Sequence, residues 1–115
     1  MELEERTAGD VVIVAVTGDI TLTKGGGVAL GDKVRSLVQQ GRKKIVLDLG
    51  GVAYMDSAGL GELVQAYATT KGKGGSLKLA RLTKRIHDLL TITKLVTVFE
   101  NYETETAAVS SFSGA

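Results

Sequence analysis

A short apolar run, Ile45 to Leu49, constrains the fold of this chain more than any other stretch. The run is rich in β-branched residues, is interrupted only by Asp48, and stops at Gly50-Gly51. This pattern is typical of a buried strand followed by a turn. After the turn, we expect the side chains of Val52, Tyr54 and Met55 to reach back onto the core.

Asp56 and Ser57 stand directly before a pattern that predicts a helix. The apolar positions that follow have the spacing i, i+3, i+4, i+7 of one buried helical face, and they are Leu60, Leu63, Val64 and Tyr67. Asp and Ser are both favoured at a helix N-terminus, because their oxygens accept hydrogen bonds from first-turn N–H groups. Ser57 is therefore expected at or beside the N-cap, with its hydroxyl exposed.

The first part of the chain predicts a hairpin and a helix. Residues 3–7 and 11–16 are the two strands around Gly9-Asp10, Gly18-Asp19 closes the second, and residues 21–23 continue extended. A helix then carries apolar residues at helical spacing and ends before Gly41; these residues are Leu30, Val34, Leu37 and Val38. Gly25-Gly26-Gly27 should fray its start, so we expect mobility near residues 23–28.

The second half continues the alternation of strands and helices. Residues 76–80 predict a strand, Thr83 caps a helix, residues 96–99 predict a last strand, and residues 104–112 a last helix. The fold class is therefore α/β in one domain over residues 1–115, with 110–115 as a flexible tail. We expect a mixed, mostly parallel sheet of about 4–5 strands with an antiparallel edge hairpin, flanked by about 4 helices. Ser57 would lie on a loop beyond the carboxyl end of a strand, where such folds place their sites.

Composition excludes several classes of chemistry. The chain has no cysteine and one histidine, which argues against disulfides, thiolate catalysis and a metal site. No apolar run approaches the roughly 18 residues of a membrane span, and no leader pattern opens the chain, so we expect a cytoplasmic protein without a membrane partner. A basic belt over residues 42–94 predicts a solvated face, and the scattered aromatic residues do not favour nucleic-acid binding.

Two catalytic or nucleotide motifs fail on particular residues. Gly26 and Gly31 have the spacing of a phosphate loop, but Asp32 stands where its lysine should follow. Met55 replaces the first glycine of the G-x-S-x-G turn of serine hydrolases, and His87 is expected on a helix surface. These residues argue against nucleotide binding and serine-hydrolase catalysis, and with the composition they predict a protein that uses no cofactor.

The segment Met55-Asp56-Ser57-Ala58-Gly59-Leu60-Gly61, preceded by residues 45–52, carries a family resemblance. With support from residues 18–21, 74–79 and 91–95, nearly the whole chain resembles a STAS domain, specifically a bacterial anti-sigma factor antagonist. Two features depart from the family pattern: Ala58 replaces a second motif serine, and glycines occupy 25–27. The first departure leaves Ser57 as the single candidate phosphate acceptor.

The resemblance implies a switch that is not an enzyme. The unphosphorylated protein binds an anti-sigma factor that is also a serine kinase with a histidine-kinase-like ATPase fold, and the sigma factor is freed. Phosphorylation of Ser57 abolishes binding until a PP2C-type serine phosphatase removes the phosphate. The implied partner-binding positions are Asp19, Thr21, Met55, Asp56, Ser57, Ala58, Gly59 and Leu60.

Two other interpretations stay open at this point. One is a STAS scaffold subunit of a larger assembly, such as a stressosome or a lipid-transport complex. The other is a receiver-like phosphorelay domain, which would need an acidic pair after its first buried strand, where Gly18-Asp19 offers one carboxylate.

Overall fold

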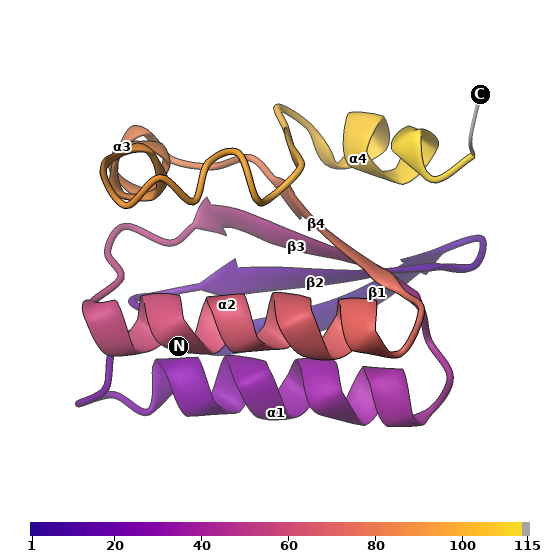
Figure 1. The fold of residues 1–115 in the computed structure, drawn as a ribbon, viewed down its shortest axis with the longest axis horizontal. Coiled ribbons are helices and arrows are strands. Elements are labelled where there is room, and N and C mark those ends of the chain that lie inside the picture. Colours follow the sequence, from indigo (N-terminus) through magenta and orange to yellow (C-terminus); the bar gives the residue numbers. More distant parts are fainter. Residues whose placement is uncertain (114–115) are drawn as a thin grey trace.

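The computed structural model describes residues 1–113, which form one mixed sheet with helices packed against it (Figure 1). In chain order the elements are β1 Glu2–Ala8, β2 Val11–Thr17, α1 Gly26–Gln39, β3 Lys44–Gly51, α2 Ser57–Gly72, β4 Ser76–Ala80, α3 Lys84–Ile92, β5 Asn101–Tyr102 and α4 Glu105–Ser111. The strand order is β1-β2-β3-β4-β5. β1 pairs antiparallel with β2, and the remaining pairs are parallel. The predicted fold class is confirmed.

The two faces of the sheet build two cores of unequal size. Alternate residues of β2, β3 and β4 meet α1 and α2, which lie side by side in Figure 1, and α3 adds Ile86 and Leu90 to the same core. The opposite face forms a smaller core under Ala108 of α4. The buried positions of β3 confirm that residues 45–49 form a central strand, covered on both sides.

Two predicted extended segments are turns instead. Residues 21–23 lead into a turn in which the N–H of Gly25 donates to the carbonyl of Leu22 at 3.1 Å. Residues 96–99 also form turns, after Lys94 takes a left-handed φ of 61°. The last strand comes later, at Asn101–Tyr102. Gly50-Gly51 was expected as a turn, but β3 continues through both residues.

The glycines at the start of α1 are part of a close contact between α1 and α2. Gly26 and Gly27 are buried inside the helix rather than in a loop before it. A Cβ on Gly27 would lie 3.1 Å from Cγ of Glu62 and 3.2 Å from Cα of Gly59. A small residue at position 27 therefore lets the two helices approach closely, a role that the sequence did not predict. A Cβ on Gly26 would instead lie 2.9 Å from the carbonyl oxygen of Asp19, in the loop before α1.

A buried carboxylate, paired with a guanidinium that is 55% exposed, fixes the end of β3 from which the loop to α2 leaves. Asp48 is 2% exposed, and its carboxylate accepts from the N–H of Gly50 at 2.9 Å and from Nη1 of Arg81 at 3.1 Å. The guanidinium lies over Gly50, where a Cβ would come within 2.7 Å of Cζ of Arg81. A side chain at position 50 would therefore displace Arg81 from Asp48.

The C-terminal helix is held against the sheet by a buried lysine. Nζ of Lys78 donates to Oγ of Ser111 at 2.8 Å and lies 4.3 Å from the centre of the Phe112 ring. Of the expected flexible tail, Ser110 and Ser111 belong to α4, and Gly114 and Ala115 lie outside the described residues.

Candidate functional site

Two loops run side by side where α2 begins. Ile20, after β2, forms an isolated parallel bridge with Met55, after β3. The N–H of Ile20 donates to the carbonyl of Tyr54 at 3.0 Å, and the N–H of Asp56 donates to the carbonyl of Ile20 at 3.2 Å. The loop that carries Ser57 is therefore held on one side by the backbone of the β2–α1 loop.

Asp56 joins the two loops through its carboxylate. It is the N-cap of α2: Oδ1 accepts from the N–H of Gly59 at 2.7 Å, and Oδ2 accepts from the N–H of Leu22 at 2.9 Å. These backbone donors, that of Leu22 first, hold the pKa of the Asp56 carboxyl below its usual range because they favour the ionised form. Asp56 thus connects the β2–α1 loop to the start of α2, and it is also partly exposed at the surface.

Ser57 is the first residue of α2 and is exposed, as the sequence predicts. Because first-turn N–H groups point outward along the helix axis, a negative group on Ser57 would lie at the positive end of the helix dipole. Ser57 therefore lies at the surface, outside the core.

Gly59 lets the neighbouring loop pass directly over the first turn of α2. A Cβ at this position would lie 2.2 Å from the carbonyl oxygen of Ile20. Real Cβ atoms do not approach an oxygen so closely, so one of the two backbones would have to move. Gly61, by contrast, has nothing within 4 Å of the same position.

Some of the other predicted partner-binding residues are exposed to solvent, and the rest are buried. Thr21, Met55 and Leu60 are buried, so their side chains offer little surface to a partner. Asp19 and Ala58 are partly exposed, and Asp19 pairs with Lys24 at 3.5 Å. The structure therefore brings all the predicted positions together, while only some of them face solvent.

Exposed apolar side chains around Ser57 are the part of the site that sequence reasoning missed. Leu22 is 69% exposed and Val28 is 50% exposed, and with Ala58 they line a shallow cavity of about 40 Å³. Tyr54, expected in the core, is 44% exposed, and Ile92 is 79% exposed. One signal was available, since Ile92 lies six residues after buried Ile86, off the spacing of a single helical face.

Replacing Asp56 with alanine should lower the urea midpoint of unfolding, since the N-cap of α2 and the Leu22 tether are lost together. Because the folded-state pKa of Asp56 is lowered, the stability it contributes is present above the ordinary value of 3.8 and is lost as pH falls through the lower folded value. Asp56→Asn keeps one acceptor and should fall between the two. Urea midpoints measured from about pH 7 to about pH 3 should therefore show the wild type falling toward Asp56→Asn at low pH, while the difference between Asp56→Asn and Asp56→Ala stays constant because neither variant ionises at position 56. A wild-type curve parallel to those of both variants would contradict this role.

Within residues 1–113, no three His, Cys, Asp or Glu side chains gather in a way that could hold a metal ion. None of the helices in the same range is long and apolar enough to cross a membrane.

Comparison with known proteins gives one family and several relatives. The family model described as "Mlab, STAS domain" matches residues 3–100. The anti-sigma-B factor antagonist of Bacillus subtilis (strain 168) is 39% identical over 71 residues, which cover 62% of this chain and 64% of that protein. The chain thus matches less than two thirds of that relative's length.

Solved structures share the fold at lower identity. A Thermotoga maritima protein, provisionally assigned as an anti-sigma factor antagonist, has a TM-score of 0.87 at 23% identity, covering 95% of this chain and 92% of that one. The anti-sigma factor antagonist SpoIIAA in its unphosphorylated form has a TM-score of 0.73 at 16% identity, covering 99% and 100%. SpoIIAA of Bacillus in its phosphorylated form has a TM-score of 0.75 at 15% identity, covering 96% and 99%.

Proposed function

The chain belongs to the STAS domain family, and we propose that it acts as an anti-sigma factor antagonist whose partner binding is switched off by phosphorylation of Ser57. The observation that carries the proposal is the exposed Ser57 hydroxyl at the start of α2, set among exposed apolar side chains. The names of the relatives support the same function.

The surface around Ser57 suits protein binding in the unphosphorylated state. Leu22 and Val28 are exposed and line a cavity with Ala58, the residue after Ser57, and Tyr54 is exposed in the loop before it. Exposed apolar side chains that lie among polar residues are typical of a protein-binding surface. Asp56 and Gly59 hold this surface in one arrangement through backbone contacts, so little ordering would be needed when a partner binds.

A phosphate would change the surface without harming the fold. It adds about −1.5 to −2 charges near neutral pH, and the N-terminus of α2 favours a negative group. A partner that covers the apolar side chains would have to desolvate that charge next to the carboxylate of Asp56. The same modification is therefore tolerated by the free protein and opposed in the complex.

The proposed partners follow from this switch. An anti-sigma factor with serine kinase activity, of the histidine-kinase-like ATPase fold, would bind the unmodified chain, release its sigma factor and phosphorylate Ser57. A PP2C-type phosphatase would restore the hydroxyl. The chain itself would act without catalysis, and we expect it to meet these partners in the cytoplasm.

A capture experiment tests the proposal. The wild-type chain is immobilised and exposed to an extract of the source cells. It should retain an ATPase of the histidine-kinase-like fold, whereas immobilised Ser57→Asp should not. Incubation of the wild-type chain with that ATPase and ATP should add one phosphate by intact mass, and Ser57→Ala should gain none. If the wild type and Ser57→Asp capture the same set of proteins, the proposal is contradicted. If both are captured as part of one stable large assembly, the scaffold interpretation is favoured.

A further inference from the structure

A groove lies directly beside the Ser57 surface, between the β3–α2 loop and α3. Its volume is about 540 Å³, and its apolar lining comes from Tyr54, Met55, Ile86, Leu89 and Ile92. Met55 and Ile86 are buried and form the floor, whereas Tyr54 and Ile92 stand at the edges with much of their surface exposed. The floor of the groove therefore belongs to the core, whereas the apolar side chains at its edges are exposed to solvent.

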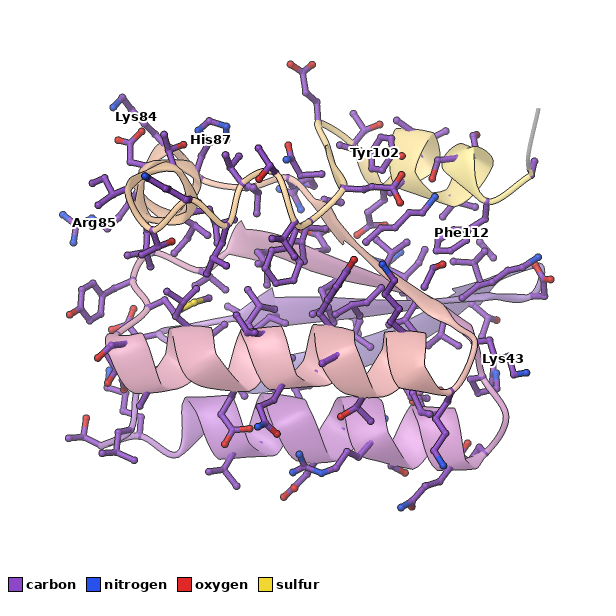
Figure 2. The ribbon with its side chains drawn as sticks, viewed as in Figure 1. Lys43, Lys84, Arg85, His87, Tyr102 and Phe112 are labelled. Carbon is purple, nitrogen blue, oxygen red and sulfur yellow. The ribbon has the colours of Figure 1, made fainter. Side chains whose placement is uncertain are left out.

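One cation at the edge of the groove is not neutralised by a carboxylate. The guanidinium of Arg85 lies 6.0 Å from the centre of the Tyr54 ring, and none of the ion pairs formed within residues 1–113 includes it. Lys84 differs, because its Nζ lies 2.8 Å from Oδ2 of Asp88 on the same helix. In Figure 2, Arg85 projects away from Lys84 and His87.

The apolar lining and the positive charge of Arg85 together indicate which kind of partner segment would bind in the groove. Large apolar side chains from a partner would fill the groove, as an amphipathic helix fills an apolar groove in other complexes. A carboxylate on that helix could pair with Arg85, which is already held over an aromatic ring and so loses less freedom on pairing. A basic or uniformly polar segment would leave Arg85 repelled or the apolar lining exposed.

We propose that this groove is a second docking surface of the same partner, and that it takes an amphipathic helix carrying a carboxylate within one turn of a large apolar side chain. The inference rests on the proposed function, because Tyr54 and Met55 connect the groove to Ser57 within one loop. The groove then contributes affinity through contacts of its own, and a phosphate on Ser57 would lower the affinity of the complex as a whole.

Affinity measurements with the purified partner, the ATPase retained by the wild-type chain, separate the two surfaces. Ile92→Asp and Arg85→Glu should each weaken binding roughly 10- to 100-fold. Thr91→Asp is the matched control for Ile92, since it makes the same charge change at an exposed position of α3 that does not line the groove. Lys73→Glu is the control for Arg85, because it makes the same charge change at the C-cap of α2. Lys73 does not line the groove. Both controls should bind within about twofold of the wild type.

Photo-crosslinking identifies the partner segment that binds in the groove. Benzoylphenylalanine at position 92 should cross-link to a partner peptide with a large apolar residue and an Asp or Glu within one helical turn. If Ser57→Asp loses binding while the groove variants match their controls, or if the cross-linked peptide is basic, the groove inference is wrong and the proposed function stands. If the groove variants lose binding while Ser57→Asp does not, the groove stands and the phosphorylation switch is wrong. Failure to retain any such ATPase would overturn both.

Discussion

Gly59→Ala is expected to destabilise the protein at the upper end of the roughly 1–3 kcal/mol that overpacking usually costs. The added methyl would lie 2.2 Å from the carbonyl oxygen of Ile20. The backbone fixes the positions of both the methyl and the carbonyl oxygen, so no side-chain rotation can relieve the contact. Either α2 or the β2–α1 loop must shift. Urea unfolding followed by far-UV circular dichroism measures the loss.

Gly61→Ala provides the control within the same helix turn. Gly61 is exposed and has nothing within 4 Å of the position of a new Cβ. Since glycine costs about 0.5–1 kcal/mol relative to alanine inside a helix, this variant should be more stable than the wild type by a similar amount. Equal stability of the two alanine variants would show that the contact between Gly59 and Ile20 does not constrain the fold.

Ser57→Asp is expected to weaken partner binding by about 2–4 kcal/mol, or roughly 30- to 1,000-fold, without destabilising the free chain. The new carboxylate lies at the N-terminus of α2, where the helix dipole favours it, and beside Asp56, where two negative groups make the surface costly to cover. Ser57→Ala should bind like the wild type. Calorimetric titration of the purified partner checks the affinities.

The matched control for charge is Ser110→Asp, on exposed α4 away from the Ser57 surface. It adds the same charge to the chain and should bind with unchanged affinity. If Ser110→Asp and Ser57→Asp weaken binding equally, the effect belongs to net charge, and the local argument fails. Unfolding midpoints of both variants, measured alongside, exclude loss of folded protein as the cause.

The sequence predicted those parts of the fold that are decided by local pattern. The apolar residues of β2 and β3 are buried as expected, and Asp56-Ser57 begins a helix whose buried positions include Leu60 and Leu63. These predictions succeed because the period of the pattern matches the geometry of the element. The exposed hydroxyl of Ser57 follows from the same local rule.

The failures fall where tertiary contacts decide the conformation. Residues 96–99 have strand-forming composition, but the left-handed turn at Lys94 precedes them and Phe99 buries its ring against Tyr67, with ring centres 5.1 Å apart. Tyr54 faces solvent because the bridge between Ile20 and Met55 sets the alternation of this loop. Neither the bridge nor the ring contact can be read from neighbouring residues alone.

The glycines at the start of α1 are another case in which tertiary contacts, rather than local sequence, decide the conformation. A local reading of Gly25-Gly26-Gly27 predicts a loop, since glycine is a poor helix former. Gly26 and Gly27 are nevertheless helical and buried. Gly27 lies against Gly59 and Glu62 of the neighbouring helix, at a distance that only a small residue permits. The cost in helix propensity is offset by close packing that involves a residue far along the chain.

The strand order has a consequence for how the protein is made. Every strand pairs with its predecessor in the chain, so each new strand leaving the ribosome finds its sheet partner already synthesised. The contacts that fix Ser57 lie between residues 18 and 62, whereas the groove must wait for α3. We therefore expect the serine surface to gain structure earlier during translation than the groove, as chain folding that follows synthesis permits.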